Sequence, residues 1–145
     1  MIRFVSISTF RSALNALLKV KRSVYAGLTS EICTAFRGVS IEQIRSNRDM
    51  ILMDGDSVII KLRLPDKKMR LSKADGYRLI YMVMKSVPVV ALLTVYPKRG
   101  PMQKLDLGEN DLGELLSTFR KEFNSRQIVI HDVDNDLAEL KPQET

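Results

Sequence analysis

Alternating and helical patterns of apolar residues divide the chain into short strands and helices. Residues 2–7 alternate apolar and polar positions, which is typical of a strand. Apolar side chains then recur at helical spacing, which predicts one helix capped by Thr9 and a second over about 22–37. Gly38 stands where a helix commonly ends. We expect the stripes to be core, with Cys33 a small buried residue beside them.

The middle of the chain predicts a meander of strands. Ser40 and Gln43 suit a capping box for a short helix that reaches about Asn47. Asp54 and Gly55 form a strong hairpin-turn signal. The strands are expected over 57–64, 76–84 and 89–96, with a polar, basic loop at 65–75 and a tight turn at 85–88.

The C-terminal part predicts one more helix and one more strand. Asp111 is expected to cap this helix, which reaches about Phe123 with Leu112, Leu115, Leu116 and Phe119 facing inward. Residues 127–131 are consistent with a strand, and the acidic stretch from Asp132 onward is expected to be frayed or disordered.

These elements indicate an α+β fold with helices on one face of a mainly antiparallel sheet. A length of 145 residues suits a single domain, which we place at 1–125. Residues 126–145 are then an acidic C-terminal extension.

Composition narrows the chemistry. Lys and Arg number 23 against 17 Asp and Glu, so the formal net charge is +6 and a polyanion is the expected partner. One cysteine excludes a disulfide framework, and the single His131 excludes a multi-histidine metal site and argues against a serine triad. No Gly-rich phosphate loop, paired metal-binding acids or membrane-length apolar run is present, so we expect no metal, no cofactor and a cytoplasmic protein. The basic, acid-free stretch 1–30 resembles an organellar presequence, but a first strand and helix explain it better.

The positive charge concentrates where three predicted strands meet. Folding the meander brings the ends of the strands at 57–64 and 89–96 beside the start of the strand at 76–84, with Arg78 roughly opposite Val95 and Tyr77 opposite Tyr96. This edge and its overhanging loop carry Lys61, Arg63, Lys67, Lys68, Arg70, Lys73, Arg78, Lys98 and Arg99. Converging cations of this kind suit phosphate binding.

Each candidate also has a structural interpretation. Lys67 and Lys68 could simply flank a hairpin in solvent, whereas Arg78 lies within an apolar strand, where an unpaired charge is costly. Tyr96 could be a core residue with its hydroxyl at the rim, or it could stack on a base or transfer a proton. His131 is expected to be structural or exposed. The acids at Asp106, Glu109, Asp111 and Glu114 are expected to mark a helix N-terminus.

Two strand motifs carry a family resemblance. Residues 75–81 (DGYRLIY) and 92–98 (LLTVYPK) resemble the RelE/ParE superfamily of type II toxin–antitoxin toxins, and most closely the RelE-like toxins often labelled HigB. The specific match covers residues 59–98. A looser match covers 2–37, and the predicted helix at 111–123 also fits.

The resemblance implies a RelE-like fold and metal-free cleavage of mRNA in the ribosomal A site. In that reaction the ribose 2′-oxygen attacks the adjacent phosphate. The resemblance implies that Arg78 contacts the scissile phosphate and, with Arg63, stabilises the transition state, while Lys73, Lys98 or Tyr96 transfers protons. The residues expected to hold RNA are Lys61, Lys67, Lys68, Arg70 and Arg99. A cognate antitoxin protein, acidic where it meets this edge, is the implied partner in a hetero-oligomer.

The chain departs from the family pattern in several places. No histidine lies near the last matched strand, the loop at 65–75 aligns loosely, the segment 40–56 is longer, and 126–145 lies beyond the match. Two alternatives stay open: a ParE-like inhibitor of DNA gyrase without chemistry of its own, and a generic basic RNA-binding domain.

Overall fold

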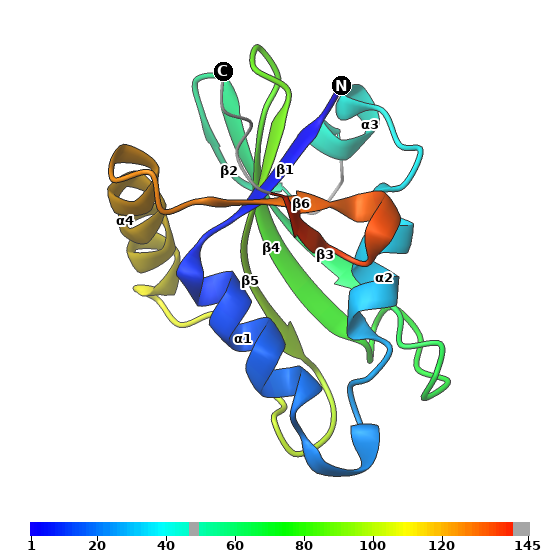
Figure 1. Cartoon of the computed structure of the whole chain (residues 1–145). Coiled ribbons are helices and arrows are strands. Elements are labelled where there is room, and N and C mark those ends of the chain that lie inside the picture. Colours follow the sequence, from blue (N-terminus) through cyan, green and yellow to red (C-terminus); the bar gives the residue numbers. More distant parts are fainter. Residues whose placement is uncertain (47–49, 141–145) are drawn as a thin grey trace.

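The computed structural model describes residues 1–46 and 50–140 (Figure 1). Four α-helices, two short 3-10 helices and seven strands make up the described part of the chain. They are, in chain order, β1 (Arg3–Ser6), α1 (Ser8–Leu18), η1 (Lys21–Ser23), α2 (Leu28–Phe36), α3 (Ile41–Arg45), β2 (Met50–Asp54), β3 (Ser57–Leu64), β4 (Tyr77–Met84), β5 (Val89–Pro97), α4 (Asp111–Asn124), β6 (Val129–Asp132), η2 (Val133–Asn135) and β7 (Ala138–Leu140).

All seven strands form one sheet in the order β2-β3-β4-β5-β1-β6-β7. Only β1 and β5 pair in parallel, so the predicted mainly antiparallel α+β architecture is confirmed. The predicted register between β4 and β5 is wrong by one residue: Arg78 lies opposite Tyr96, and Tyr77 lies opposite Pro97. The cause is a register shift after Ile80, a β-bulge that a turn-based count does not include.

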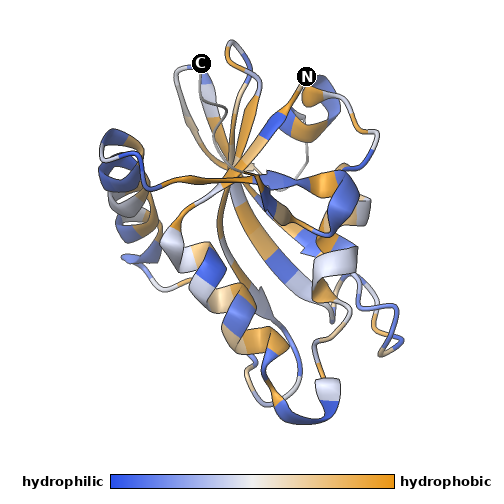
Figure 2. Cartoon of the chain, in the orientation of Figure 1, coloured by the Kyte–Doolittle hydropathy of each residue, from blue (hydrophilic) through white to orange (hydrophobic). Residues whose placement is uncertain are grey.

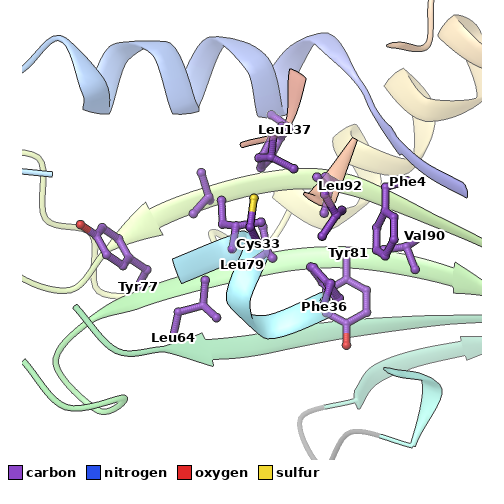
Figure 3. Close-up of a cluster of buried hydrophobic side chains, with 14 of the residues drawn as sticks. Phe4, Cys33, Phe36, Leu64, Tyr77, Leu79, Tyr81, Val90, Leu92 and Leu137 are labelled. Atoms are coloured by element: carbon purple, nitrogen blue, oxygen red, sulfur yellow. The ribbon is translucent and has the colours of Figure 1, made fainter. Parts of the chain in front are cut away.

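Helices cover both faces of the sheet, so the expectation that they share one face is wrong. On one face α1 and α2 enclose a core that includes Cys33, Phe36 and Leu92 (Figure 3). On the other face Leu115 and Phe119 of α4 pack in a second core. Because side chains alternate along a strand, a strand buried on both faces is largely apolar, and a charged residue within it, such as Arg78 of β4, needs partners inside the protein. β4 is buried from Tyr77 to Val83, and Figure 2 shows the central strands as strongly hydrophobic.

The N-terminal helices begin and end differently from the prediction. α1 begins at Ser8 with Ile7 as its N-cap, so Thr9 lies inside the helix and does not cap it. α2 begins at Leu28, because Arg22 and Ser23 adopt positive φ angles of 68° and 54° that an α-helix excludes. Gly38 has φ of 72° just after α2, as its predicted helix-ending role requires.

Local signals in the middle of the chain are confirmed. The Ser40 side chain accepts from the Gln43 N–H at 3.2 Å and completes a capping box for α3. The predicted limit of this helix at Asn47 lies outside the described residues. The β2–β3 hairpin forms with Asp54 paired to Ser57, and Gly55 at φ 58° begins its two-residue turn.

The C-terminal segment joins the sheet. β6 pairs with β1, β7 pairs with β6, and η2 lies between them, so the prediction of a frayed chain from Asp132 is wrong over 132–140. His131 was expected to be either structural or exposed, and the structure shows that it is structural. It is buried, Ser6 Oγ donates to its Nε2 at 2.6 Å, and its Nδ1–H donates to the Leu137 carbonyl at 2.8 Å. The last helix has Asn110 as its N-cap, so Asp111 lies in the first turn and does not cap it.

Candidate nucleic-acid interface

Three strand ends meet at one edge of the sheet, as predicted. Leu64 at the end of β3 lies opposite Tyr77 at the start of β4, which in turn lies opposite Pro97 at the end of β5. Gly76 makes this approach possible, since a Cβ at that position would stand 2.0 Å from the Leu64 carbonyl oxygen. The backbone therefore brings the chain segments around 61–64, 76–78 and 96–99 together.

The basic loop between β3 and β4 is anchored by two buried acids. Glu31 of α2 accepts from the Lys67 backbone N–H at 2.7 Å. Asp66 accepts from the Tyr77 hydroxyl at 2.9 Å, and its backbone pairs with Leu71 in both directions. Burial, and then the bond to Asp66, raise the pKa of Tyr77. The loop thus has a fixed base beside the first turn of α2, where Figure 1 shows it in green.

The predicted site residues fall into two groups of five. The first group is exposed, and its side-chain nitrogens make no hydrogen bond or ion pair within the described part of the chain. Its members are Arg63, Lys67, Lys68, Arg70 and Lys73. Three of them, Arg63, Lys67 and Lys73, line a hollow of about 330 Å³ between α2, α3 and β3. These cations are available to an external anion.

Arg78 belongs to the second group, whose polar atoms bind within the protein. Its side chain is buried, with 8% of the residue exposed. Nη1 donates to the carbonyls of Lys73 at 2.8 Å and Tyr77 at 3.1 Å, and Nη2 donates to the Ala74 carbonyl at 2.9 Å. A buried guanidinium requires such acceptors. Arg78 therefore ties the end of the basic loop to the start of β4.

Tyr96 and Lys61 share one acceptor, Asp106. One oxygen of that carboxylate, Oδ1, accepts from Lys61 Nζ at 3.2 Å, from the Tyr96 hydroxyl at 3.3 Å and from the Leu107 N–H at 2.8 Å. The Leu107 N–H, and then Lys61 and Tyr96, lower the pKa of Asp106. Burial first, and then Asp106, raise the pKa of Tyr96. The phenol therefore keeps its proton at neutral pH and directs it to Asp106.

The two remaining residues of the second group are also held by the chain. Lys98 Nζ donates to the Leu105 carbonyl, and Arg99 pairs with Asp75 at 2.6 Å. The loop that follows β5 thus folds back over the ends of the strands. Lys104 of that loop has its Nζ 5.9 Å from the centre of the Tyr96 ring.

Asp106 lies at this edge, although it was expected to mark the N-terminus of a helix. Asp111 and Glu114 lie in the first turn of α4, as expected of a helix N-terminus, but Asp106 lies five residues before that helix and binds Lys61. No periodic pattern marks it, because its place depends on the path of an irregular loop. Its isolation between Leu105 and Leu107 is the only local signal.

The arrangement is suited to anion binding. Among residues 1–46 and 50–140, no group of three or more His, Cys, Asp or Glu side chains could hold a metal ion. His131 is bonded within the core and lies on β6, away from the three strand ends. Lys and Arg side chains thus supply the available charge at this edge. No helix among the described residues is long and apolar enough to cross a membrane.

Comparisons with known proteins give a distant likeness among solved structures. No protein-family model matches the sequence, and no curated protein matches it. Among solved structures the chain is similar to the toxin RelE of E. coli, in a mutant with two arginines replaced by alanine and in the free state. The identity is 21%, the match covers 84% of this chain and 98% of that chain, and the TM-score is 0.38. A likeness at this level does not place the chain in a family.

Proposed function

We propose that the protein is a toxin of a type II toxin–antitoxin system that cleaves mRNA on the ribosome without a metal ion. One observation supports this above the others: five exposed cations, which have no hydrogen-bond or ion-pair partner within residues 1–46 and 50–140, are gathered on one strand end and one anchored loop. RNA presents regularly spaced phosphates, and Lys and Arg neutralise them with release of counterions. The resemblance of 75–81 and 92–98 to RelE-like strands supports the choice of an RNA-cleaving toxin over a generic RNA-binding domain.

The proposed chemistry divides the edge into binding and positioning residues. Cleavage by the ribose 2′-oxygen requires removal of its proton, a proton for the departing 5′-oxygen, and stabilisation of the extra charge on phosphorus. Arg63, which is exposed and has no side-chain partner in the part of the chain that the structure describes, is the proposed transition-state stabiliser. Lys73 lines the same hollow and is the proposed proton-transfer group, with Lys98 and Tyr96 as the other candidates.

Arg78 is proposed as a positioning residue in this scheme. Its guanidinium donates to the backbone of Lys73 itself, so it fixes the segment that carries the proposed proton-transfer group. A role through Lys73 accounts for its burial, which a direct contact with RNA does not. Lys67, Lys68 and Arg70 then bind neighbouring phosphates along the strand.

The proposed partners follow from the charge of this edge. The substrate is mRNA in the ribosomal A site, and the inhibitor is a cognate antitoxin with acidic side chains that cover the same cations. The cytoplasm is the proposed location, since translation supplies the substrate there.

Expression of the chain alone, followed by mapping of mRNA ends in translating cells, tests the proposal. New ends positioned in frame within coding regions are expected for the wild type and not for Arg63→Ala or Lys73→Ala. Lys121→Ala removes an exposed cation from α4 and is the matched control, which should cut like the wild type. Inhibition of DNA gyrase with intact mRNA would instead support the ParE-like alternative.

A further inference from the structure

A carboxylate lies beside two of the candidate residues of the cationic edge, Lys61 and Tyr96. Asp106 Oδ1 lies 3.2 Å from Lys61 Nζ and 3.3 Å from the Tyr96 hydroxyl, so both donors converge on one anionic oxygen. The Leu107 N–H completes the set at 2.8 Å. Three donors around one oxygen is also the environment that proteins offer to a phosphate oxygen. Asp106 therefore holds a position in which an RNA phosphate would find the same partners.

The ion pair between Lys61 and Asp106 is exposed enough to solvent for the two side chains to separate. The side chain of Asp106 is 62% exposed and that of Lys61 is 27% exposed. Ion pairs at such exposure contribute little to stability, so an incoming phosphate can exchange with the carboxylate at small cost. Lys61 has no second acidic partner among the described residues, whereas the five free cations of the edge need no such exchange.

We propose that Asp106 is an internal competitor of RNA phosphate for Lys61 and so limits the affinity of the site for RNA. The inference rests on the proposed function and deepens it. In the free protein Lys61 is neutralised by Asp106, and on binding the carboxylate yields Lys61 to a phosphate. The Tyr96 hydroxyl and the Leu107 N–H continue to donate to the Asp106 carboxylate when that exchange occurs.

Binding of a short single-stranded oligoribonucleotide tests the proposal directly. The probe carries 2′-O-methyl groups, so it cannot be cut, and affinity is followed by fluorescence anisotropy at several salt concentrations. Asp106→Asn keeps an oxygen that accepts from Leu107 and Tyr96 but removes the charge. Glu109→Gln removes the same charge three residues along the same loop, where no contact of the side chain is recorded among the described residues, and is the matched control.

The expected results separate competition from a general change in charge. Asp106→Asn should bind up to about fivefold more tightly than Glu109→Gln, the upper limit set by the roughly 1 kcal/mol of an exposed ion pair. In a Lys61→Met background the gain should disappear. Equal affinities for the two carboxylate variants, or a gain that persists without Lys61, would overturn the proposal.

A second measurement is independent of RNA. In NMR titrations of the free protein, Lys61→Met should raise the pKa of Asp106, because it removes a cation that now lowers it. An unchanged pKa would refute the pairing and with it the competition, while the proposed function would stand. If the wild type binds the probe no better than Arg63→Ala does, the proposed function itself fails.

Discussion

Arg78 offers the sharpest test of the proposed division between positioning and binding residues. Arg78→Ala removes three hydrogen bonds, to the carbonyls of Lys73, Ala74 and Tyr77. Hydrogen bonds to a charged donor contribute roughly 1.5–3 kcal/mol each. The Lys73 and Ala74 carbonyls belong to exposed residues and regain water, so we expect a loss of about 3 kcal/mol in the free energy of unfolding. In a domain of this size that lowers Tm by roughly 6–12 °C.

The assay pairs thermal unfolding with hydrogen exchange and mRNA cleavage. Arg78→Ala is expected to lower Tm, to lose amide protection in the loop at 65–75 and to abolish cleavage. Arg63→Ala is the matched control, since the exposed Arg63 side chain has no partner among the described residues. Its free energy of unfolding should stay within about 0.5 kcal/mol of the wild-type value, and it should still lose cleavage. An Arg78→Ala protein with wild-type Tm and loop protection but no cleavage would refute the positioning role and favour direct contact with RNA.

Two further predictions concern the fold. Gly76→Ala should prevent folding or lower Tm severely, because the new Cβ meets the Leu64 carbonyl. Gly113→Ala in α4 is the contrasting variant: its Cβ meets nothing within 4 Å, so it should stabilise the helix by up to about 1 kcal/mol. Thermal unfolding of the two variants tests both expectations. Burial lowers the pKa of His131 in the folded state, so the unfolded chain binds more protons below about pH 6.5 and stability should fall as the pH drops from about 7 to 5.5. Urea unfolding should show this slope, and an unchanged slope in His131→Gln would contradict the assignment.

Local sequence signals predicted most of the strands but not their surroundings. β3 matches the expected 57–64, because alternating side chains and a following proline are local features. The start of α2 was missed, since the left-handed Arg22 and Ser23 do not alter the apolar pattern. β7 and its pairing with β6 were missed as well, because an acidic composition argued against order while pairing with a neighbouring strand supplied it.

The sequence predicted where the candidate site lies in the fold, but it did not predict which side chains of the site bind one another. Neighbouring antiparallel strands share their ends, so the meeting of three strand ends followed from turn positions. The internal partners of Arg78 and Lys61 depend instead on the path of two irregular loops. Charge in a sequence therefore located the edge, whereas only the fold separates the cations that are free from those that are already bound.

The freedom of the loop cations has a physical origin in the two acids that anchor the loop. Glu31 and Asp66 both lie beside Lys67, the first bonded to its backbone and the second preceding it in the chain. Both are buried: Glu31 accepts from the Lys67 backbone N–H, and Asp66 accepts from the Tyr77 hydroxyl. A carboxylate used in this way stabilises the loop without forming an ion pair with the lysines that the loop exposes. The same segment that is fixed in place therefore keeps its positive charge, and the formal charge of +6 understates the local potential at this edge. Because the base of the loop is already ordered and its cations have no partner among the described residues, binding costs little further ordering of the protein, which favours RNA affinity at the loop over affinity at the Asp106-bound Lys61.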